Sequence, residues 1–191
     1  MLNIRFLQKL GRSFRKSQQG VAAIEFAILA PILILLFVGT LEISLAVAVD
    51  RKVSRVSSSI ADLITQSNDL SSNEVDEILD VANRIMQPYD DDISISVVGV
   101  EIKDDEAKVV WACQRNGGGK PSVGSDYTIP AQIMVNDTFL VSATVATSHE
   151  PAFKFIGYKN GKLTFDETAI EMEEQMFLRP RLGSSVEVTG C

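Results

Sequence analysis

An apolar run from Val21 to Val49 constrains this 191-residue chain more than any other feature. Four polar residues interrupt the run, namely Glu25, Thr40, Glu42 and Ser44. A helix rises about 1.5 Å per residue, so this run exceeds the roughly 30 Å hydrocarbon core of a bilayer. We therefore predict a single membrane-spanning helix over residues 21–49.

Charge is distributed unevenly around this run. Residues 1–20 carry no acidic residue and five basic ones, which are Arg5, Lys9, Arg12, Arg15 and Lys16. The remaining chain has 13 basic residues against all 25 acidic ones, a formal charge of −12. The positive-inside rule then places a basic leader, 1–20, in the cytoplasm and the acidic body outside it. Such a body lacks the clustered Lys and Arg that nucleic-acid binding requires.

A conventional cleaved signal peptide is the alternative interpretation of the N-terminus. The basic leader suits it, but the apolar run is about twice the usual length of a signal h-region. The sequence therefore favours a retained membrane helix.

Beyond Asp50 the sequence predicts an amphipathic stem helix over residues 50–68. Its apolar residues recur at helical spacing, as Val53, Val56, Ile60 and either Leu63 or Ile64. A second helix is predicted after Ser71 or Ser72, either of which can act as N-cap, and Pro88 ends it. The apolar face of this second helix consists of Val75, Ile78, Leu79, Ala82, Ile85 and Met86.

From Ile93 the apolar spacing changes to every second residue. "ISISVVGVEI" and "KVVWACQR" flank the charged turn "KDDEA" and predict a β-hairpin. Residues 116–130, "NGGGKPSVGSDYTIP", predict a surface loop, and "TFLVSATVATSHEP" predicts another strand. "KLTFDETA" and "AIEMEEQMFLRPR" add one or two more. Residues 69–191 are therefore expected to form an α+β domain with an antiparallel sheet of about four strands.

The two cysteines, Cys113 and Cys191, both fall in the part placed outside the cytoplasm, where disulfides form and persist. A bridge between them would close a long loop and stabilise the domain by roughly 4 kcal/mol. Two buried or free thiols are the alternative.

The acidic body offers no convincing catalytic or metal site. His149 is the only histidine, so one chain can build neither a Cys/His metal cluster nor a histidine-based triad. The acidic clusters "YDDDI" and "KDDE" lack the Ca²⁺-loop pattern and are interpreted as solvated turns. "NGGG" at 116–119 lacks the Lys and Ser/Thr of a phosphate loop. We expect no cofactor and no metal.

Glu25 stands where the hydrocarbon begins, five residues after Gly20. One interpretation is an interfacial side chain that snorkels to water. The other is that a cytoplasmic peptidase cuts after Gly20, which makes Val21 a new N-terminus with a free ammonium one helical turn from Glu25. In a bundle of such helices, the ammonium of one chain can then pair with the carboxylate of its neighbour.

The stretch "GVAAIEF" after a basic leader resembles the type IV prepilin-type signal, in which a membrane aspartyl peptidase cuts after the glycine. More narrowly, "QQGVAAIEFAILAPILILLFVGTLEIS" resembles the TadE-like pseudopilins of tight-adherence (Tad, or Flp) pilus systems. The family pattern includes Glu25 and, with it, Phe26, Pro31, Gly39 and Glu42. The resemblance implies processing between Gly20 and Val21, a pilin-like fold and no catalytic residue.

Three positions deeper in the run are candidates for helix packing. Gly39 offers a close-approach face one turn before Glu42, which either packs against a partner helix or lies at the interface. Pro31 removes one backbone hydrogen bond, so a kink or a local melt during assembly is an option.

Two functions from different classes follow from these patterns. The first is a non-enzymatic minor pseudopilin of TadE, TadF or TadG type in the bacterial inner membrane. Its body would be periplasmic, and its partners would be the prepilin peptidase, other pseudopilins and the pilus assembly platform. The second is a single-pass, membrane-anchored periplasmic binding or sensor domain, or an enzyme. No nucleophile-base pair in the sequence supports an enzyme.

Overall fold

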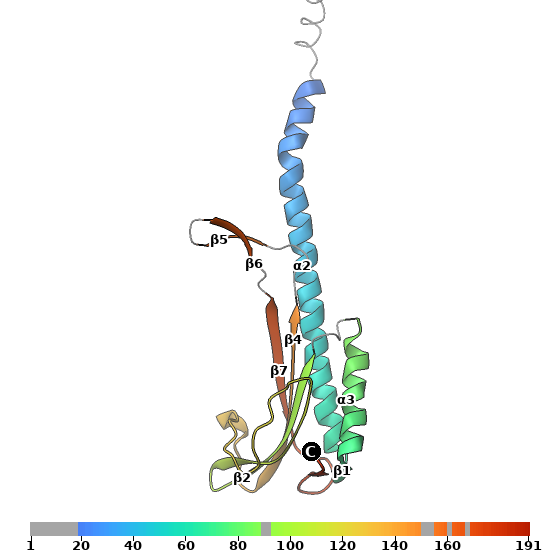
Figure 1. Cartoon of the computed structure of the whole chain (residues 1–191), viewed down its shortest axis with the longest axis vertical. Helices are drawn as coiled ribbons and strands as arrows, with labels where there is room; N and C mark the ends of the chain where they lie inside the picture. Colours follow the sequence, from blue (N-terminus) through green and yellow to red (C-terminus); the bar gives the residue numbers. More distant parts are fainter. Residues whose placement is uncertain (1–18, 89–92, 150–154, 160–161, 167–168) are drawn as a thin grey trace, which may run out of the picture. The chain divides into compact units, whose positions relative to one another are not determined.

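The computed structural model describes residues 19–88, 93–149, 155–159, 162–166 and 169–191 (Figure 1). They belong to two compact units, of which the first ends at Ser44 and the second begins at Leu45. Residues 1–18 of the expected leader and most of the "YDDDI" cluster lie outside the described residues.

Helix α2, Gln19–Thr65, contributes to both units. In the first unit its apolar side chains are exposed almost without exception. The hydroxyls that interrupt the run are satisfied within the helix, because Thr40 donates to the Leu36 carbonyl oxygen and Ser44 to that of Thr40, at 2.8 and 2.7 Å. Pro31 lies inside the helix, which continues through it. A helix in hydrocarbon requires its polar groups to form hydrogen bonds within the helix, because no water is available to them.

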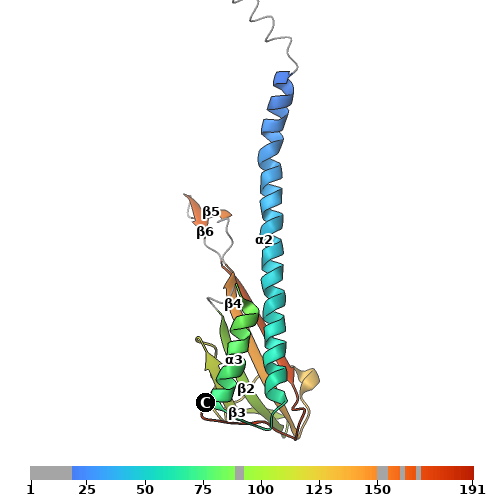
Figure 2. The same cartoon turned by 90° about the vertical axis from the view of Figure 1, so that its right-hand side faces the viewer.

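In the second unit α2 is amphipathic, as the spacing predicted. One stripe is buried and consists of Val49, Val53, Val56, Ile60, Ala61 and Ile64. Of the two alternatives at the end of the stripe, Ile64 is the buried residue and Leu63 is partly exposed. The stripe packs against the sheet (Figure 2), and the buried Ser57 hydroxyl donates to the Ala143 carbonyl oxygen at 2.9 Å.

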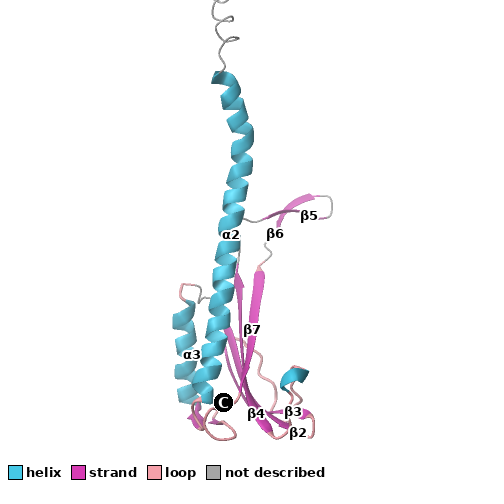
Figure 3. Cartoon of the chain, turned by 180° about the vertical axis from the view of Figure 1, so that it is seen from behind, coloured by secondary structure: helices cyan, strands magenta, loops and turns pink. Residues whose placement is uncertain are grey.

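The sheet has four antiparallel strands in the order β3-β2-β4-β7. The strands are β2 (Ser94–Lys103), β3 (Glu106–Arg115), β4 (Thr138–His149) and β7 (Ile170–Leu178). Asp104 and Asp105 connect β2 to β3, with φ of 52° and 60°. Positive φ at both residues of a two-residue turn matches the right-handed twist of the strands. The α+β class, the hairpin and the four-stranded sheet are confirmed (Figure 3).

Both faces of the sheet are covered, which explains why β2 is buried along most of its length. The helical face carries Ile95, Val97, Phe139, Val141, Ala143 and Val145 in one core with α2 and α3. The opposite face carries Val98, Val100, Ile102, Val109 and Leu140 under Tyr127, Ile129, Ile133 and Met134. The covering segment includes a single 3-10 turn, Ala131–Ile133. The predicted surface loop therefore forms part of a second core.

Helix α3, Ser72–Met86, starts from the first of the two N-caps that the sequence offered. Ser71 and Glu74 form a capping box, in which the Glu74 N–H points to the Ser71 hydroxyl and the Ser71 N–H donates back to the Glu74 carboxylate at 2.8 Å. The backbone bond, followed by the bond from the Ser71 hydroxyl, lowers the pKa of Glu74 below its ordinary value. The predicted apolar face is largely buried, through Val75, Leu79, Ala82 and Met86.

The sequence did not predict a short parallel pairing at the base of the domain. Strand β1 (Asp69–Ser71) pairs with β8 (Glu187–Thr189), which the C-terminal segment 179–191 contributes. A further hairpin, β5 (Phe155–Lys159) and β6 (Lys162–Asp166), is antiparallel.

The C-terminal segment is also tied to α2 and to β3. The Arg181 N–H donates to the carbonyl oxygen of Thr65 at 2.8 Å, which satisfies one of the open carbonyls at the end of α2. The Trp111 indole N–H of β3 donates to the Val186 carbonyl oxygen at 2.7 Å. Cys113 and Cys191 form the expected disulfide, and their sequence separation is 78.

Removal of the disulfide is expected to destabilise the domain. Cys191→Ser should lower the free energy of unfolding by roughly 4 kcal/mol, because the unfolded chain regains the entropy of a long open loop. Denaturant unfolding of the solubilised full chain measures this loss, and reductant should bring the parent protein to a similar value. Two freely alkylated thiols in native protein would contradict the bridge.

A glycine in the loop after β3 makes a close approach that tolerates no side chain. A Cβ on Gly118 would lie 2.2 Å from the Ile95 carbonyl oxygen, whereas a Cβ on the next residue, Gly119, would meet nothing within 4 Å. We predict that Gly118→Ala lowers stability by about 1 to 3 kcal/mol, because backbone must shift to accommodate the methyl group. Gly119→Ala is the matched control and should unfold like the parent protein. Equal midpoints for the two variants would show that the loop is not held against β2.

Candidate functional site

The candidate processing residues lie in the first two turns of α2. The helix begins at Gln19, so Gly20 and Val21 are already helical, and Gly20 has open space where a Cβ would lie. Val21 and Glu25 are four residues apart and therefore share one face of the helix. Both side chains are exposed. Among the described residues, this face is open to a neighbouring molecule.

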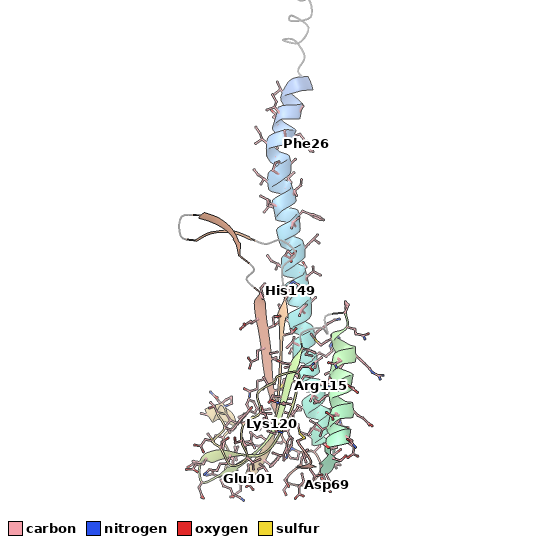
Figure 4. All side chains as sticks on the ribbon, in the orientation of Figure 1. Phe26, Asp69, Glu101, Arg115, Lys120 and His149 are labelled. Carbon is pink, nitrogen blue, oxygen red and sulfur yellow. A yellow bond between two sulfur atoms is a disulfide. The ribbon has the colours of Figure 1, made fainter. Side chains whose placement is uncertain are left out.

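Exposed apolar side chains surround this face and continue along the first unit. Phe26, which projects from α2 in Figure 4, is 69% exposed, and Ile24 and Leu35 are similarly exposed. Apolar surface on this scale marks a contact with lipid or protein. The most apolar stretch of the helix contains no buried residue. By length and composition, α2 can cross a membrane.

The three candidate packing positions also lie on this helix. Gly39 has no atom within 4 Å of the position that a Cβ would take, so its close-approach face is available to another chain. Glu42 lies three residues further, on the same side, and is partly buried. Pro31 is eight residues before Gly39. The structure thus places these residues on one helix, and their role in packing stays a prediction.

The other sequence candidates have structural roles or lie elsewhere. Asp105 in the β2–β3 turn exchanges two hydrogen bonds with Asn136, at 2.8 and 2.9 Å, so its carboxylate is engaged in holding the loop. Asn116 of "NGGG" donates to the Ile93 carbonyl oxygen at 3.0 Å. His149 is the last residue of β4. Within the part of the chain that the structure describes, no group of three His, Cys, Asp or Glu residues is placed to hold a metal ion.

Residues 20–62 match the family model described as TadE-like protein. Over this segment the chain is TadE-like. The resemblance that the N-terminal motif indicated is thereby confirmed for the TadE-like segment, which begins at Gly20 and ends three residues before the end of α2. Searches of the curated proteins and of the solved structures gave no match to the chain.

The TadE-like segment extends well past the apolar run, into the amphipathic half of α2. There the apolar spacing indicates only the buried stripe, and the opposite, polar face was not among the sequence candidates. Arg51 and Arg55 lie on that face, one helical turn apart, and both are exposed. Their spacing was a signal that could have been read from the sequence.

Proposed function

We propose that this chain is a minor pseudopilin of a Tad (Flp) pilus system that acts without enzymatic activity in pilus assembly. The observation that carries the proposal is the TadE-like match, which implicates Tad pilus assembly and begins at the glycine where a leader would end. The exposed apolar helix that follows this glycine supports the proposal, because a subunit of this class needs a membrane-inserted helix before assembly.

In this proposal the chain has four parts. Residues 1–20 are a cytoplasmic leader, 21–49 cross the inner membrane, 50–68 form the stem, and 69–191 form the periplasmic domain. The Cys113–Cys191 disulfide supports a periplasmic location, since such bonds persist in oxidising compartments. The partners are the prepilin peptidase, the other pseudopilins and the pilus assembly platform.

Cleavage after Gly20 would create a positive charge with which the Glu25 carboxylate can pair. The new ammonium on Val21 and the Glu25 carboxylate of a neighbouring helix are opposite charges in a low-dielectric setting. Each one alone would cost several kcal/mol in hydrocarbon. Pairing offsets that cost, so the acid would favour a processed neighbour over lipid and would set the axial register between subunits.

Processing is tested first at the glycine. Gly20→Leu should block cleavage, because close approach of the backbone to a peptidase favours a residue without a side chain. Intact mass should show the precursor retained in membranes, whereas Gly39→Leu, the same change nineteen residues further along α2, should be processed normally. Retention of residues 1–20 in the parent protein, in cells with active prepilin peptidase, would instead favour the membrane-anchored sensor or enzyme.

The role of Glu25 in assembly is tested with one variant that removes the charge and one that shortens the side chain. Glu25→Gln should insert into the membrane at least as well as the parent, because the apolar run drives insertion, but it should fail to assemble. Glu25→Asp should give an intermediate yield, since it keeps the charge on a shorter side chain. The measurements are the yield of pili or cross-linked heteromers, the inserted fraction and the cleavage state of each variant. Normal assembly of Glu25→Gln would show that the acid is only interfacial.

A further inference from the structure

Two open grooves run along the part of α2 that belongs to the second unit. One lies between α2 and β7 and is lined by Asp50, Arg51, Ser54, Arg55, Ser58 and Leu178; we name it the β7-side groove. The other lies between α2 and α3 and is lined by Leu63, Glu74, Glu77, Ile78, Asp80 and Arg84; we name it the α3-side groove. The lower part of α2 in Figures 1 and 3 is flanked by β7 on one side and α3 on the other.

The two grooves differ in the sign of the net charge that intramolecular ion pairs leave over, which is positive in the β7-side groove and negative in the α3-side groove. In the β7-side groove, Arg51 and Arg55 have no ion-pair or hydrogen-bond partner in the described part of the chain. Asp62, which also borders this groove, is held by Arg181. In the α3-side groove, Asp80 is held by Arg115 at 2.6 Å, and Glu77 has no partner among the described residues.

The order of the charges along the two grooves is also complementary. Helix α3 runs antiparallel to α2, because Lys52 reaches the Gln87 carbonyl oxygen beyond the end of α3 while Leu63 lines the groove with Glu74. Starting from the end nearer the apolar run, the β7-side groove presents Asp50 followed by two arginines. From the same end, the α3-side groove presents Arg84 followed by three acids, Asp80, Glu77 and Glu74.

This order fits two copies that stand parallel, which is the orientation that membrane anchoring imposes on them. Asp50 and Arg55 are about 7.5 Å apart along α2, and Arg84 and Glu77 are about 10.5 Å apart along α3. The long side chains of Arg and Glu span the difference. In an antiparallel arrangement, like charges would meet instead.

We infer that the β7-side groove of one copy of this chain docks onto the α3-side groove of a second copy. The contact rests on the proposed function, for which it supplies a subunit interface. The two grooves are different surfaces, so the contact is heterologous and leaves one groove of each kind free at the ends of a row. Leu63 lines the groove beside Glu74, so Glu77 lies about three residues nearer the apolar run. Pairing Glu77 with Arg55 therefore displaces the neighbour along the helix axis by roughly five residues, about 7.5 Å.

The inference is tested with two full-length copies that carry different tags in the same membrane. A photo-cross-linking amino acid at Ser58 of one copy should yield a product that contains both tags and maps to α3 of the other copy. Arg55→Glu in both copies should reduce this product several-fold, and so should Glu77→Arg in both. Lys103→Glu, a matched reversal on the β2–β3 hairpin, should leave the yield unchanged.

The decisive experiment combines the two variants in one membrane. When one tagged copy carries Arg55→Glu and the other Glu77→Arg, every groove again faces the opposite charge, so the yield should return toward the parent value. Restoration also shows that each variant is folded. An unchanged yield for the single variants, no restoration on mixing, or a cross-link only to a different protein would each overturn the inference.

Intact mass from the same membranes keeps the two proposals apart. Cleavage after Gly20 without a charge-dependent cross-link overturns the contact and leaves the pseudopilin function standing. A charge-dependent cross-link in cells that never remove residues 1–20 supports the contact and counts against the function.

Discussion

Val49, Val53, Val56, Ile60 and Ile64 bury one side of α2 against the sheet and α3, and the second unit is built around this stripe. The same helix, before Ser44, exposes apolar side chains on all sides. The residue pattern of this one helix therefore changes along its length. It is apolar on all sides before Ser44 and amphipathic where it packs in the second unit. The TadE-like match, residues 20–62, includes both the apolar part and most of the amphipathic part of α2.

The end of α2 depends on residues that are remote in sequence. The last turn of α2 leaves carbonyl groups without a partner in the helix, and the Arg181 N–H donates to one of them, that of Thr65. The segment that carries Arg181 is in turn held by the β1–β8 pairing, by Trp111 and by the disulfide to β3. These contacts connect the C-terminal segment to α2, β1 and β3, so the end of α2 is held through residues more than a hundred positions away.

Predictions from the sequence succeeded where the signal is local. The N-cap of α3 was narrowed to Ser71 or Ser72 from residues that adjoin the helix, and the turn at Asp104 and Asp105 involves only two adjacent residues. The pairing of β1 with β8 could not be predicted in this way, because each strand has three residues and more than a hundred residues separate them. For the candidate site, Gly20 and Glu25 were identified from a local motif, whereas the two grooves beside α2 are formed only when β7 and α3 pack against it.

The sequence alone determined that this chain has one long apolar helix, a TadE-like N-terminal motif and an α+β body, because periodicity, caps and charge asymmetry are properties of neighbouring residues. The tertiary structure decided which strands form the edges of the sheet, what covers its second face and which charges stay unpaired. Arg55 and Glu77 illustrate the difference. Each is an ordinary exposed residue in the sequence, and only the antiparallel packing of α3 on α2 gives their grooves opposite charge orders, because that packing reverses the chain direction between the two helices.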